Sequence, residues 1–406
     1  MPAPSIRPAV PLIFLIIAGC LVAAIGNGVR TSFGLFTLPM SADLGLTREG
    51  WGMAMAIQNL VWGLTQPFAG AYADRVGTGR TIAIGAAIYA LGVLGMAFSP
   101  SASLLAVSAG IVTGIGIAIS SFSVIMAAFG RSVPAEKRSL IFGVATAASS
   151  FGQFAFAPIS QGFISAFGWQ QALIWLAFAL LLIVPLSYTL RGRAEAPAGE
   201  VHMPFGQTLR RAWGFTSYRL LVIGFFVCGF HIAFINVHLP AYLVQCGLSA
   251  EAGSWTIAVI GLFNIVGSLS AGYLGGKLPK QMLLASIYFL RTVAIGLFLL
   301  IPVSEASAYA FGAAMGLLWL STVPPTAGLV TTFFGPRYMG MLYGVAFFSH
   351  QLGSFAGIWL GGFAYDHTGS YSLVWYLGII LGLASAALHL PINERRDDAF
   401  ALKPAE

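Results

Sequence analysis

The chain has 406 residues, of which 58% are hydrophobic and 8% are charged. A soluble domain averages about 25% charged residues, so this composition excludes an ordinary soluble protein and indicates an integral membrane protein. The formal net charge of +7 comes mainly from loops between apolar segments, so it is no evidence for a nucleic-acid partner.

Twelve apolar runs, each long enough to cross a hydrocarbon core of about 30 Å, follow one another along the chain. They are continuously apolar and do not alternate, so they predict membrane-spanning helices and exclude a β-barrel. The first run continues well past signal-peptide length, so we expect it to remain in the membrane. The expected spans are 11–40, 50–72, 80–99, 104–130, 138–166, 170–190, 217–245, 253–275, 281–302, 307–333, 338–364 and 371–391.

The basic residues between the spans predict the orientation. Seventeen of the 20 fall on one side of the membrane, while Arg48 falls on the other side and Arg30 and Arg291 lie within spans. Basic loops stay in the cytoplasm. We therefore expect a multi-pass protein of the inner (plasma) membrane with both termini in the cytoplasm.

The two halves of the chain repeat each other. Three junction motifs recur at an almost constant offset of 201 or 202 residues, which pairs Gly70 with Gly272, Gly143 with Gly344, and Gly168 with Gly369. This spacing predicts a six-helix bundle at 1–190, a cytoplasmic central loop at 191–216 with one surface helix near Phe205–Trp213, and a second six-helix bundle at 217–406. Repeats of this kind place a substrate site near the membrane midplane, between the halves.

The segment GAYADRVGTGR, from Gly70 to Arg80, resembles the signature loop between spans two and three of the major facilitator superfamily. The resemblance implies that fold, with alternating access by rocking of the two bundles. It also implies a gating role for Asp74, Arg75 and Arg80, whose alternative is that of solvated loop charges. The second copy lacks the aspartate, since residues 275–277 read GGK.

Span one resembles the monocarboxylate carriers and the oxalate–formate exchanger group. It reads GNGVRTSFGLFTLPM from Gly26, and those carriers have a basic residue followed by a Ser/Thr-aromatic segment at this place. In this chain the matching residues are Arg30, Thr31, Ser32 and Phe33. The segment HLPAYL, from His238 to Leu243, resembles span seven of the same group.

Two departures narrow the substrate that this resemblance implies. Span eight carries Asn264 and Ser268 where relatives often have an aspartate and an arginine. Span eleven carries His350 and Gln351 where oxalate exchangers have a lysine. A second fixed cation is therefore missing, which favours a monocarboxylate or a larger organic anion over oxalate.

Arg30 and Arg291 lie within spans in which no Asp or Glu is available to neutralise them. A charge at the bilayer centre costs about 3 kcal/mol or more, so it usually marks a water-filled path or a counter-ion. We expect an anionic substrate to supply the counter-charge. The alternatives are that Arg30 reaches the membrane interface, and that Arg291 is structural, bonded to backbone carbonyls or to Tyr288.

Three histidines could carry a coupling proton, because histidine titrates near physiological pH. His231 and His238 are seven residues apart and share one helix face, and His350 belongs to a polar pair in span eleven. The alternative for each is a neutral imidazole that is hydrogen-bonded between helices.

Other polar and aromatic residues fit the lining of a substrate cavity, since polar groups in a membrane face protein or water. Some of them could instead join helices to one another. Together with Arg30, Arg291, His238 and His350, the predicted substrate-binding set is Asn27, Phe33, Gln58, Asn59, Gln153, Tyr242, Trp319 and Gln351.

The sequence predicts a secondary active transporter of small organic anions, most simply monocarboxylates, that works by proton symport or anion exchange. An exporter of neutral or amphipathic compounds and a non-transporting membrane sensor or scaffold stay open as alternatives. We expect no enzyme activity, cofactor or bound metal, because no phosphate loop, metal cluster or nucleophile–base set is present, and Cys20, Cys228 and Cys246 show no metal spacing. The expected partners are the substrate, the lipid bilayer and protons, and the expected state is a monomer.

Overall fold

The computed structural model describes residues 11–192 and 205–397, and every regular element within those ranges is a helix. The predicted all-α membrane fold is confirmed. The basic residues Arg7 and Lys403 and residues 193–204 of the predicted central loop lie outside the described residues. The predicted surface helix of that loop is present as α10 (Phe205–Gly214).

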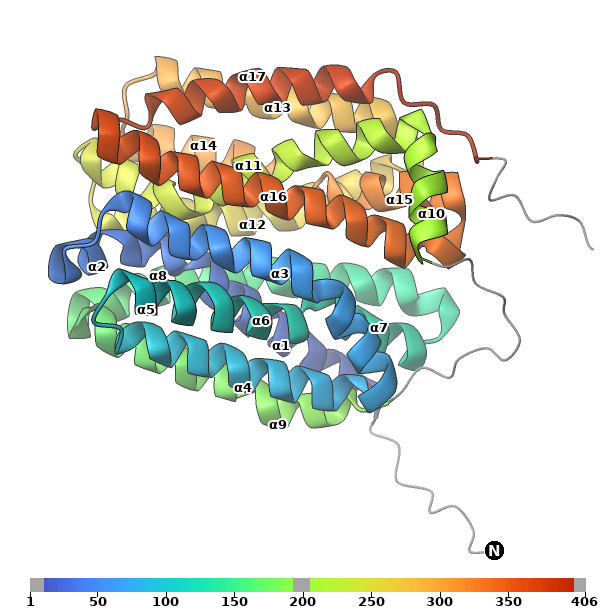
Figure 1. The fold of residues 1–406 in the computed structure, drawn as a ribbon, viewed down its shortest axis with the longest axis horizontal. Helices are drawn as coiled ribbons and strands as arrows, with labels where there is room; N and C mark the ends of the chain where they lie inside the picture. The colour runs from blue at the N-terminus through green and yellow to red at the C-terminus, as the bar shows by residue number, and fades with distance from the viewer. Residues whose placement is uncertain (1–10, 193–204, 398–406) are drawn as a thin grey trace, which may run out of the picture.

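The chain forms two bundles that lie side by side (Figure 1). The first contains α1 (Leu12–Thr31), η1 (Phe33–Phe36), α2 (Thr37–Leu44), α3 (Arg48–Val76), α4 (Thr78–Ala97), α5 (Ala102–Leu105), η2 (Ala106–Val112), α6 (Thr113–Ile119), α7 (Phe122–Ser132), α8 (Ala135–Leu181), α9 (Ile183–Ser187) and η3 (Tyr188–Leu190). The second contains α11 (Thr216–Gln245), α12 (Ala250–Leu274), α13 (Lys280–Leu300), α14 (Glu305–Leu318), α15 (Val323–Phe334), α16 (Pro336–Thr368) and α17 (Ser372–His389).

Nine helical stretches of the described chain are long and apolar enough to cross a membrane. Predicted spans five and six share one of them, Leu140–Leu190, because α8 continues through a bend at Gly168, whose φ is +81°. Predicted spans two and eleven correspond to α3 and α16, which are not among the nine. Their polar residues make them less apolar, and those residues line a cavity between the bundles.

The structure breaks both halves at matching places. Span four is interrupted at Ser120 and Ser121, and span ten at 319–322, so the two breaks are separated by the offset of 201 residues seen in the sequence. Gly168 and Gly369 are related by the same offset, and both have positive φ, +81° and +68°. Glycine tolerates this conformation without a steric cost, which explains its presence at both turns.

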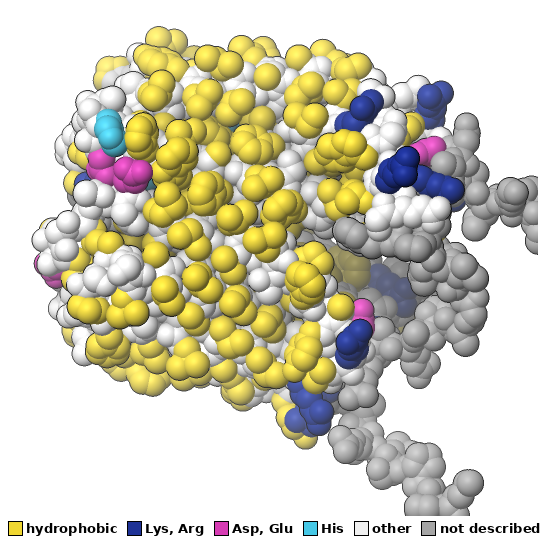
Figure 2. All heavy atoms as spheres, viewed as in Figure 1, with side chains coloured by type: hydrophobic (Ala, Val, Ile, Leu, Met, Phe, Trp, Pro, Cys, Tyr) yellow, Lys and Arg dark blue, Asp and Glu magenta, His cyan; other side chains and the backbone are white. Residues whose placement is uncertain are grey.

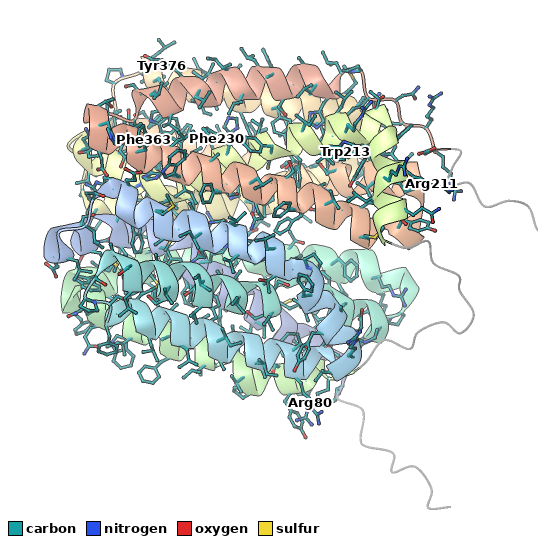
Figure 3. All side chains as sticks on the ribbon, viewed as in Figure 1. Arg80, Arg211, Trp213, Phe230, Phe363 and Tyr376 are labelled. Carbon is teal, nitrogen blue, oxygen red and sulfur yellow. The ribbon has the colours of Figure 1, made fainter. Side chains whose placement is uncertain are left out.

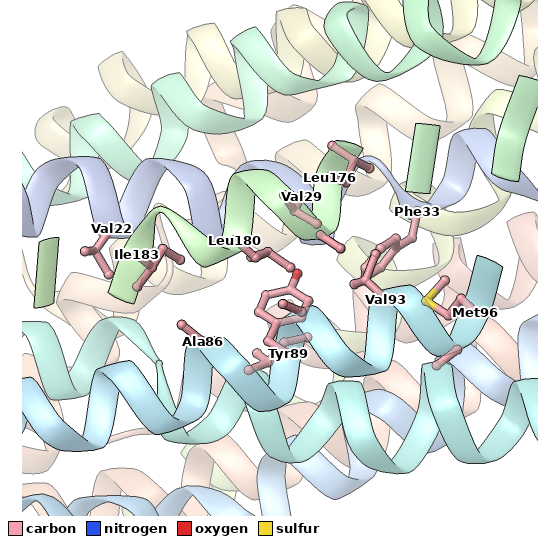
Figure 4. Packing of buried hydrophobic residues seen from close by; sticks show 14 of the residues in the cluster. Val22, Val29, Phe33, Ala86, Tyr89, Val93, Met96, Leu176, Leu180 and Ile183 are labelled. Carbon is pink, nitrogen blue, oxygen red and sulfur yellow. The ribbon is translucent and has the colours of Figure 1, made fainter. Parts of the chain in front are cut away.

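Each bundle has a hydrophobic core of its own. The first core is drawn almost entirely from residues before 191, and the second almost entirely from residues after 211. In the first bundle, this core includes Tyr89 and Ala86 of α4, Val29 of α1, Leu180 of α8 and Ile183 of α9 (Figure 4).

Apolar side chains cover the flanks of the molecule, and Lys and Arg gather at the end next to α10 (Figure 2). Arg80 and Arg211 both lie at that end, which we call the basic end (Figure 3). The opposite end carries the 45–47 and 369–371 turns. An apolar flank between two polar ends is what a membrane-spanning bundle requires.

The closest crossing of α1 and α8 gives a first prediction. A Cβ added at Gly152 would lie 2.6 Å from the carbonyl carbon of Ala24, whereas one added at Gly162, also in α8, meets nothing within 4 Å. Overpacking of this kind costs about 1–3 kcal/mol. We expect Gly152→Ala to lower the melting temperature in detergent, and Gly162→Ala to leave it unchanged or slightly raised. Equal melting temperatures for the two variants would contradict a close crossing of α1 and α8 at Gly152.

Candidate functional site

A central cavity lies between the bundles. Both bundles line it: α1, η1, α3 and α8 on one side, and α11, α16 and the break in span ten on the other. Its lining residues are Asn27, Arg30, Phe33, Met55, Gln58, Asn59, Trp62, Gln153, Phe225, Ile232, Ala233, Asn236, Val237, Trp319, Leu320, Val323, Tyr343, Phe347, His350, Gln351, Ser354 and Ile358.

Nine of the predicted substrate-binding residues therefore line one cavity. No Asp or Glu is among the described residues that line it, Arg30 is its arginine, and His350 is its histidine. The walls are otherwise apolar, aromatic or carboxamide, with one hydroxyl from Ser354. Such a lining suits a ligand with an apolar body and few polar groups.

Arg30 lies in the last turn of α1, where the helix dipole favours a positive charge. Its Nη2 donates to Oδ1 of Asn27 at 3.1 Å, and its guanidinium carbon lies 5.2 Å from the ring centroid of Trp62. Asn27 is held in turn, since its Nδ2 donates to the carbonyl of Ser149 at 3.0 Å. Within the described chain these contacts leave the remaining guanidinium N–H groups free to meet an anion.

A second, smaller cavity adjoins the first and shares Asn27, Arg30 and Trp62 with it. It lies within the first bundle, between residues that include Val22 of α1 and Phe122 of α7. Val22 is two turns closer than Arg30 to the basic end, where α1 begins. The guanidinium of Arg30 therefore lies at the junction of the central cavity and a smaller cavity toward the basic end.

Three carboxamides of the first bundle are anchored on backbone carbonyls. Gln58 Nε2 donates to Ala109 O at 2.8 Å, and Asn59 Nδ2 donates to Met55 O at 2.9 Å. Gln153 Nε2 reaches across to the second bundle, where Ile257 O accepts at 3.4 Å. These bonds fix the amide planes, so each amide presents a defined atom to the cavity.

The second bundle contributes a polar cluster of His350, Gln351 and Ser354, of which the sequence predicts the first two as site residues. His350 Nδ1 lies 3.0 Å from Oε1 of Gln351, and Ser354 Oγ lies 3.4 Å from the same oxygen. Asn236 of α11 also lines the cavity, although we had not predicted it. Asn236 lies between His231 and His238 in the sequence, and a polar amide at that place in an apolar span is the sequence feature that indicates a site residue.

The structure places two predicted proton-coupling residues and one predicted binding residue outside the central cavity. His231 Nε2 is paired with the carbonyl of Gly378 and His238 Nε2 with that of Ile358, each at 2.8 Å, and both rings are buried. Tyr242 belongs to an aromatic cluster with Phe298, Tyr371 and Trp375. For these three residues the geometry matches packing and inter-helix hydrogen bonding.

Arg291 is also absent from the cavity lining, contrary to the predicted substrate contact. It is fully buried, its Nε and Nη2 donate to the carbonyl of Leu318 at 3.1 and 2.5 Å, and its Nη2 also donates to the carbonyl of Trp319. Pro324 and Pro325 lack the N–H groups that would bond the carbonyls of Leu320 and Ser321, so span ten does not continue as one regular helix, and α14 ends at Leu318. The guanidinium therefore caps the carbonyls that the end of α14 leaves unpaired.

Asn264 holds the same break from the other side. Its Oδ1 accepts from Leu320 N at 3.0 Å, and its Nδ2 donates to Ser150 Oγ of the first bundle at 2.9 Å. One carboxamide of α12 therefore contacts both the interrupted helix and the opposite bundle.

The opposite end is sealed by contacts between the bundles. The carboxylate of Asp366 in α16 accepts from the backbone N–H groups of Arg48 and Glu49, at 3.1 and 2.7 Å. These are the first residues of α3, so the carboxylate caps the positive end of that helix dipole. Trp359 Nε1 donates to Glu49 Oε1 at 3.1 Å, which adds a second link.

This seal gives a second prediction. Removing the charge of Asp366 should weaken the cap by about 1 kcal/mol and open the seal about fivefold more often. The reporter is a cysteine at the cavity position Met55 (Met55→Cys), which is modified by an impermeant thiol reagent and followed by site-resolved mass spectrometry. We expect Asp366→Asn to increase the rate of this modification. Asp43→Asn is the control, because Asp43 bonds to Trp169 within one bundle. Equal rates in both backgrounds would contradict a role of Asp366 in closure.

The predicted gating charges lie at the basic end, where α3 ends and α4 begins. Beside them, Arg131 Nη2 donates to Thr78 Oγ1 at 2.7 Å, within the first bundle. In the second bundle, Lys280 forms an ion pair with Glu394 at 3.2 Å. Among the described residues no hydrogen bond or ion pair joins Asp74, Arg75 or Arg80 to the other bundle, so their gating role stays a prediction.

No group of three or more His, Cys, Asp or Glu side chains in the described ranges is placed to hold a metal ion. What the fold and the site define instead is a membrane transporter with two bundles around a cavity at their interface.

The sequence profile described as "Major Facilitator Superfamily" matches residues 15–358, and the chain belongs to that superfamily. The predicted family is thus confirmed, and with it a transporter that is not an enzyme, has a small-molecule substrate and resides in a lipid membrane.

Relatives extend over nearly the whole chain. An uncharacterized MFS-type transporter, YcxA, of Bacillus subtilis (strain 168) is 27% identical over 382 residues, covering 91% of this chain and 92% of the relative. Monocarboxylate transporter 13 of Rattus norvegicus is 27% identical over 382 residues, covering 88% and 83%. The predicted resemblance to monocarboxylate carriers is confirmed by these similarities.

Solved structures share the fold. A D-xylose-proton symporter superposes with a TM-score of 0.74 at 14% identity, covering 94% of this chain and 96% of that one. A bacterial homolog of the human lysosomal transporter Spinster superposes with a TM-score of 0.72 at 13% identity, covering 98% and 100%. At these identities the likeness concerns the fold alone.

Proposed function

We propose that this protein is a secondary active transporter that moves small organic anions, in particular monocarboxylates, across the plasma membrane by alternating access. The observation that carries the proposal is Arg30, a guanidinium at the junction of two cavities with no carboxylate partner among the described residues. Arginine can donate two parallel hydrogen bonds to one carboxylate, so it binds an anion with defined geometry. The monocarboxylate transporters among the relatives support the same substrate class.

The orientation belongs to this proposal. The basic end would face the cytoplasm, together with both termini, because basic segments stay on that side. The seal formed by Asp366 and the start of α3 would then close the outer side, and the smaller cavity beside Arg30 would lead inward.

Coupling is proton symport or anion exchange. His350 is the histidine among the described residues that line the central cavity. Histidine can gain and lose a proton near physiological pH, so His350 is the proton carrier that we favour if the protein is a symporter. Anion exchange would need no titrating side chain.

The test is uptake into proteoliposomes. Labelled lactate, pyruvate and formate are supplied with and without an inward proton gradient, and with each unlabelled acid preloaded inside. Uptake driven by the gradient indicates symport, and uptake that needs an internal acid indicates exchange. The proposal would be refuted if no acid is taken up and Arg30→Gln does not differ from the wild type in carboxylate binding.

The aromatic lining favours a second candidate, an exporter of amphipathic compounds. Phe33, Trp62, Trp319 and Phe347 offer flat apolar surfaces to a ligand of that kind. Expression in an efflux-deficient strain separates the two candidates, because drug resistance that survives Arg30→Gln would favour export.

A further inference from the structure

Two buried polar atoms on the second bundle's side of the cavity have no hydrogen-bond partner in the described chain. They are Nε2 of Gln351, a donor, and Oδ1 of Asn236, an acceptor. Gln351 is fully buried and Asn236 is 6% exposed, yet both line the central cavity. Buried polar groups are normally paired, so two unpaired atoms on one cavity wall point to a ligand that pairs them.

The amide of Gln351 has a defined orientation. Its oxygen faces two groups that can donate, His350 Nδ1 and Ser354 Oγ, so its NH₂ group is the end left without a partner. The unpaired oxygen of Asn236 can only accept. A ligand group that pairs with Gln351 must therefore accept a hydrogen bond, and one that pairs with Asn236 must donate one.

Both amides belong to the second bundle, whereas Arg30 belongs to the first. Gln351 packs on Gly63: a Cβ added at Gly63 would lie 2.8 Å from the Cβ of Gln351. Trp62 is the residue before Gly63, and the guanidinium of Arg30 lies over its ring. Asn236 packs on Gly34, four residues after Arg30. The charged contact and the neutral contacts thus face one cavity from opposite bundles.

We propose that the cargo is a monocarboxylate that carries a second, neutral group able both to donate and to accept a hydrogen bond, such as a hydroxyl or a carboxamide. This inference rests on the proposed function. The carboxylate binds Arg30, the neutral group binds Asn236 or Gln351, and the apolar body between them lies against the aromatic walls. Asn236 and Gln351 are then the residues that determine specificity.

The same arrangement disfavours two other classes of acid. A dicarboxylate would bring an ionised second carboxylate, which cannot donate to Asn236 and finds no second arginine or lysine among the described lining residues. A plain alkyl or aryl acid would leave both amide atoms unpaired. A site built to bind a hydroxyl discriminates strongly against an analogue that lacks it.

The experiment is competition against uptake of a labelled acid, with pairs of unlabelled acids that differ by one group. The pairs are phenylacetate with 4-hydroxyphenylacetate and butanoate with 4-hydroxybutanoate, and butanedioate is the dicarboxylate. We expect at least one hydroxy acid to inhibit the wild type about tenfold more strongly than its plain partner. Asn236→Leu or Gln351→Met should remove that advantage, because one of the two changes deletes the hydrogen-bond partner of the hydroxyl.

Gln245→Met is the matched control, because Gln245 lies outside the cavity and donates to Gly369 at the opposite end. It should keep the preference for the hydroxy acid. If one cavity variant fails to fold, the other variant and the wild-type comparison still decide the question.

The outcomes separate the two proposals. Equal inhibition by plain and hydroxylated acids, or strongest inhibition by butanedioate, would overturn this inference and leave an anion transporter in place. If no acid is transported and none binds, the proposed function itself fails.

Discussion

Replacing Arg30 with Gln is expected to weaken carboxylate binding by about 10- to 100-fold, the loss that corresponds to about 1.5–3 kcal/mol for hydrogen bonds to a charged group. Arg30 is the arginine of the central cavity, and within the described ranges its guanidinium bonds a neutral amide and lies against an indole ring. The measurement is a thermal-shift titration of purified protein with a series of carboxylates, since a ligand that binds the native state raises its melting temperature.

The fold should tolerate the same change. Arg30 has no ion-pair partner in the described chain, and a charge within a membrane span is costly, so Arg30→Gln should melt at the wild-type temperature or above it. Arg30→Lys keeps the charge but loses the planar fork, and intermediate affinity is expected. Wild-type affinity in Arg30→Gln would show that the anion binds elsewhere.

Replacing Arg291 with Met is expected to have the opposite profile, with lost stability and no direct loss of a substrate contact. The change would leave the carbonyls of Leu318 and Trp319 buried and unpaired, at about 1–3 kcal/mol each. We expect a clearly lower melting temperature in detergent and a lower yield of folded protein. Arg291→Lys should recover part of the loss, because an ammonium group can still donate.

The control for this second prediction is Arg219→Met, a partly exposed arginine whose Nη2 donates to Thr216 Oγ1 three residues away. It should change the melting temperature little, because side chains outside buried networks contribute little. If Arg291→Met melts like the wild type but loses anion transport, Arg291 would be a functional residue after all.

The two arginines show what could be predicted from the sequence and what could not. Long apolar runs predict spans, and a shared offset predicts a repeat, because both depend only on the order of residues along the chain. Arg30 and Arg291 look alike in that respect: each is a lone cation in an apolar run. They differ in the direction each side chain takes from its helix, and one sequence does not contain that information.

The break in span ten explains why the role of Arg291 was hard to predict. The segment from Leu318 to Val323 reads LWLSTV, which continues the apolar pattern without an evident interruption. The unpaired carbonyls that bind Arg291 exist only because the helix stops there. The two prolines that follow are the available sign, but a proline within a span predicts a kink as readily as a break.

Asn236 was missed for a different physical reason. The helix that carries it, α11, has 83% of its most apolar window buried, so no polar face distinguishes one side from another. Periodicity identifies a cavity-lining face only when an opposite face contacts something different, such as lipid. His231 and His238, on the same helix, were consequently placed in the site, although their rings pack between helices.

The paired contacts of Asn264 have a mechanical consequence. Its amide joins Ser150 of one bundle to the backbone of Leu320 in the other, next to the carbonyls that Arg291 holds. If the bundles move apart at this level, either the hydrogen bond from Asn264 to Ser150 breaks or the broken segment of span ten moves together with the first bundle. Trp319 and Leu320 lie at this break and also line the cavity. A change in the angle between the bundles would therefore change the shape of the cavity through the side chain of Asn264.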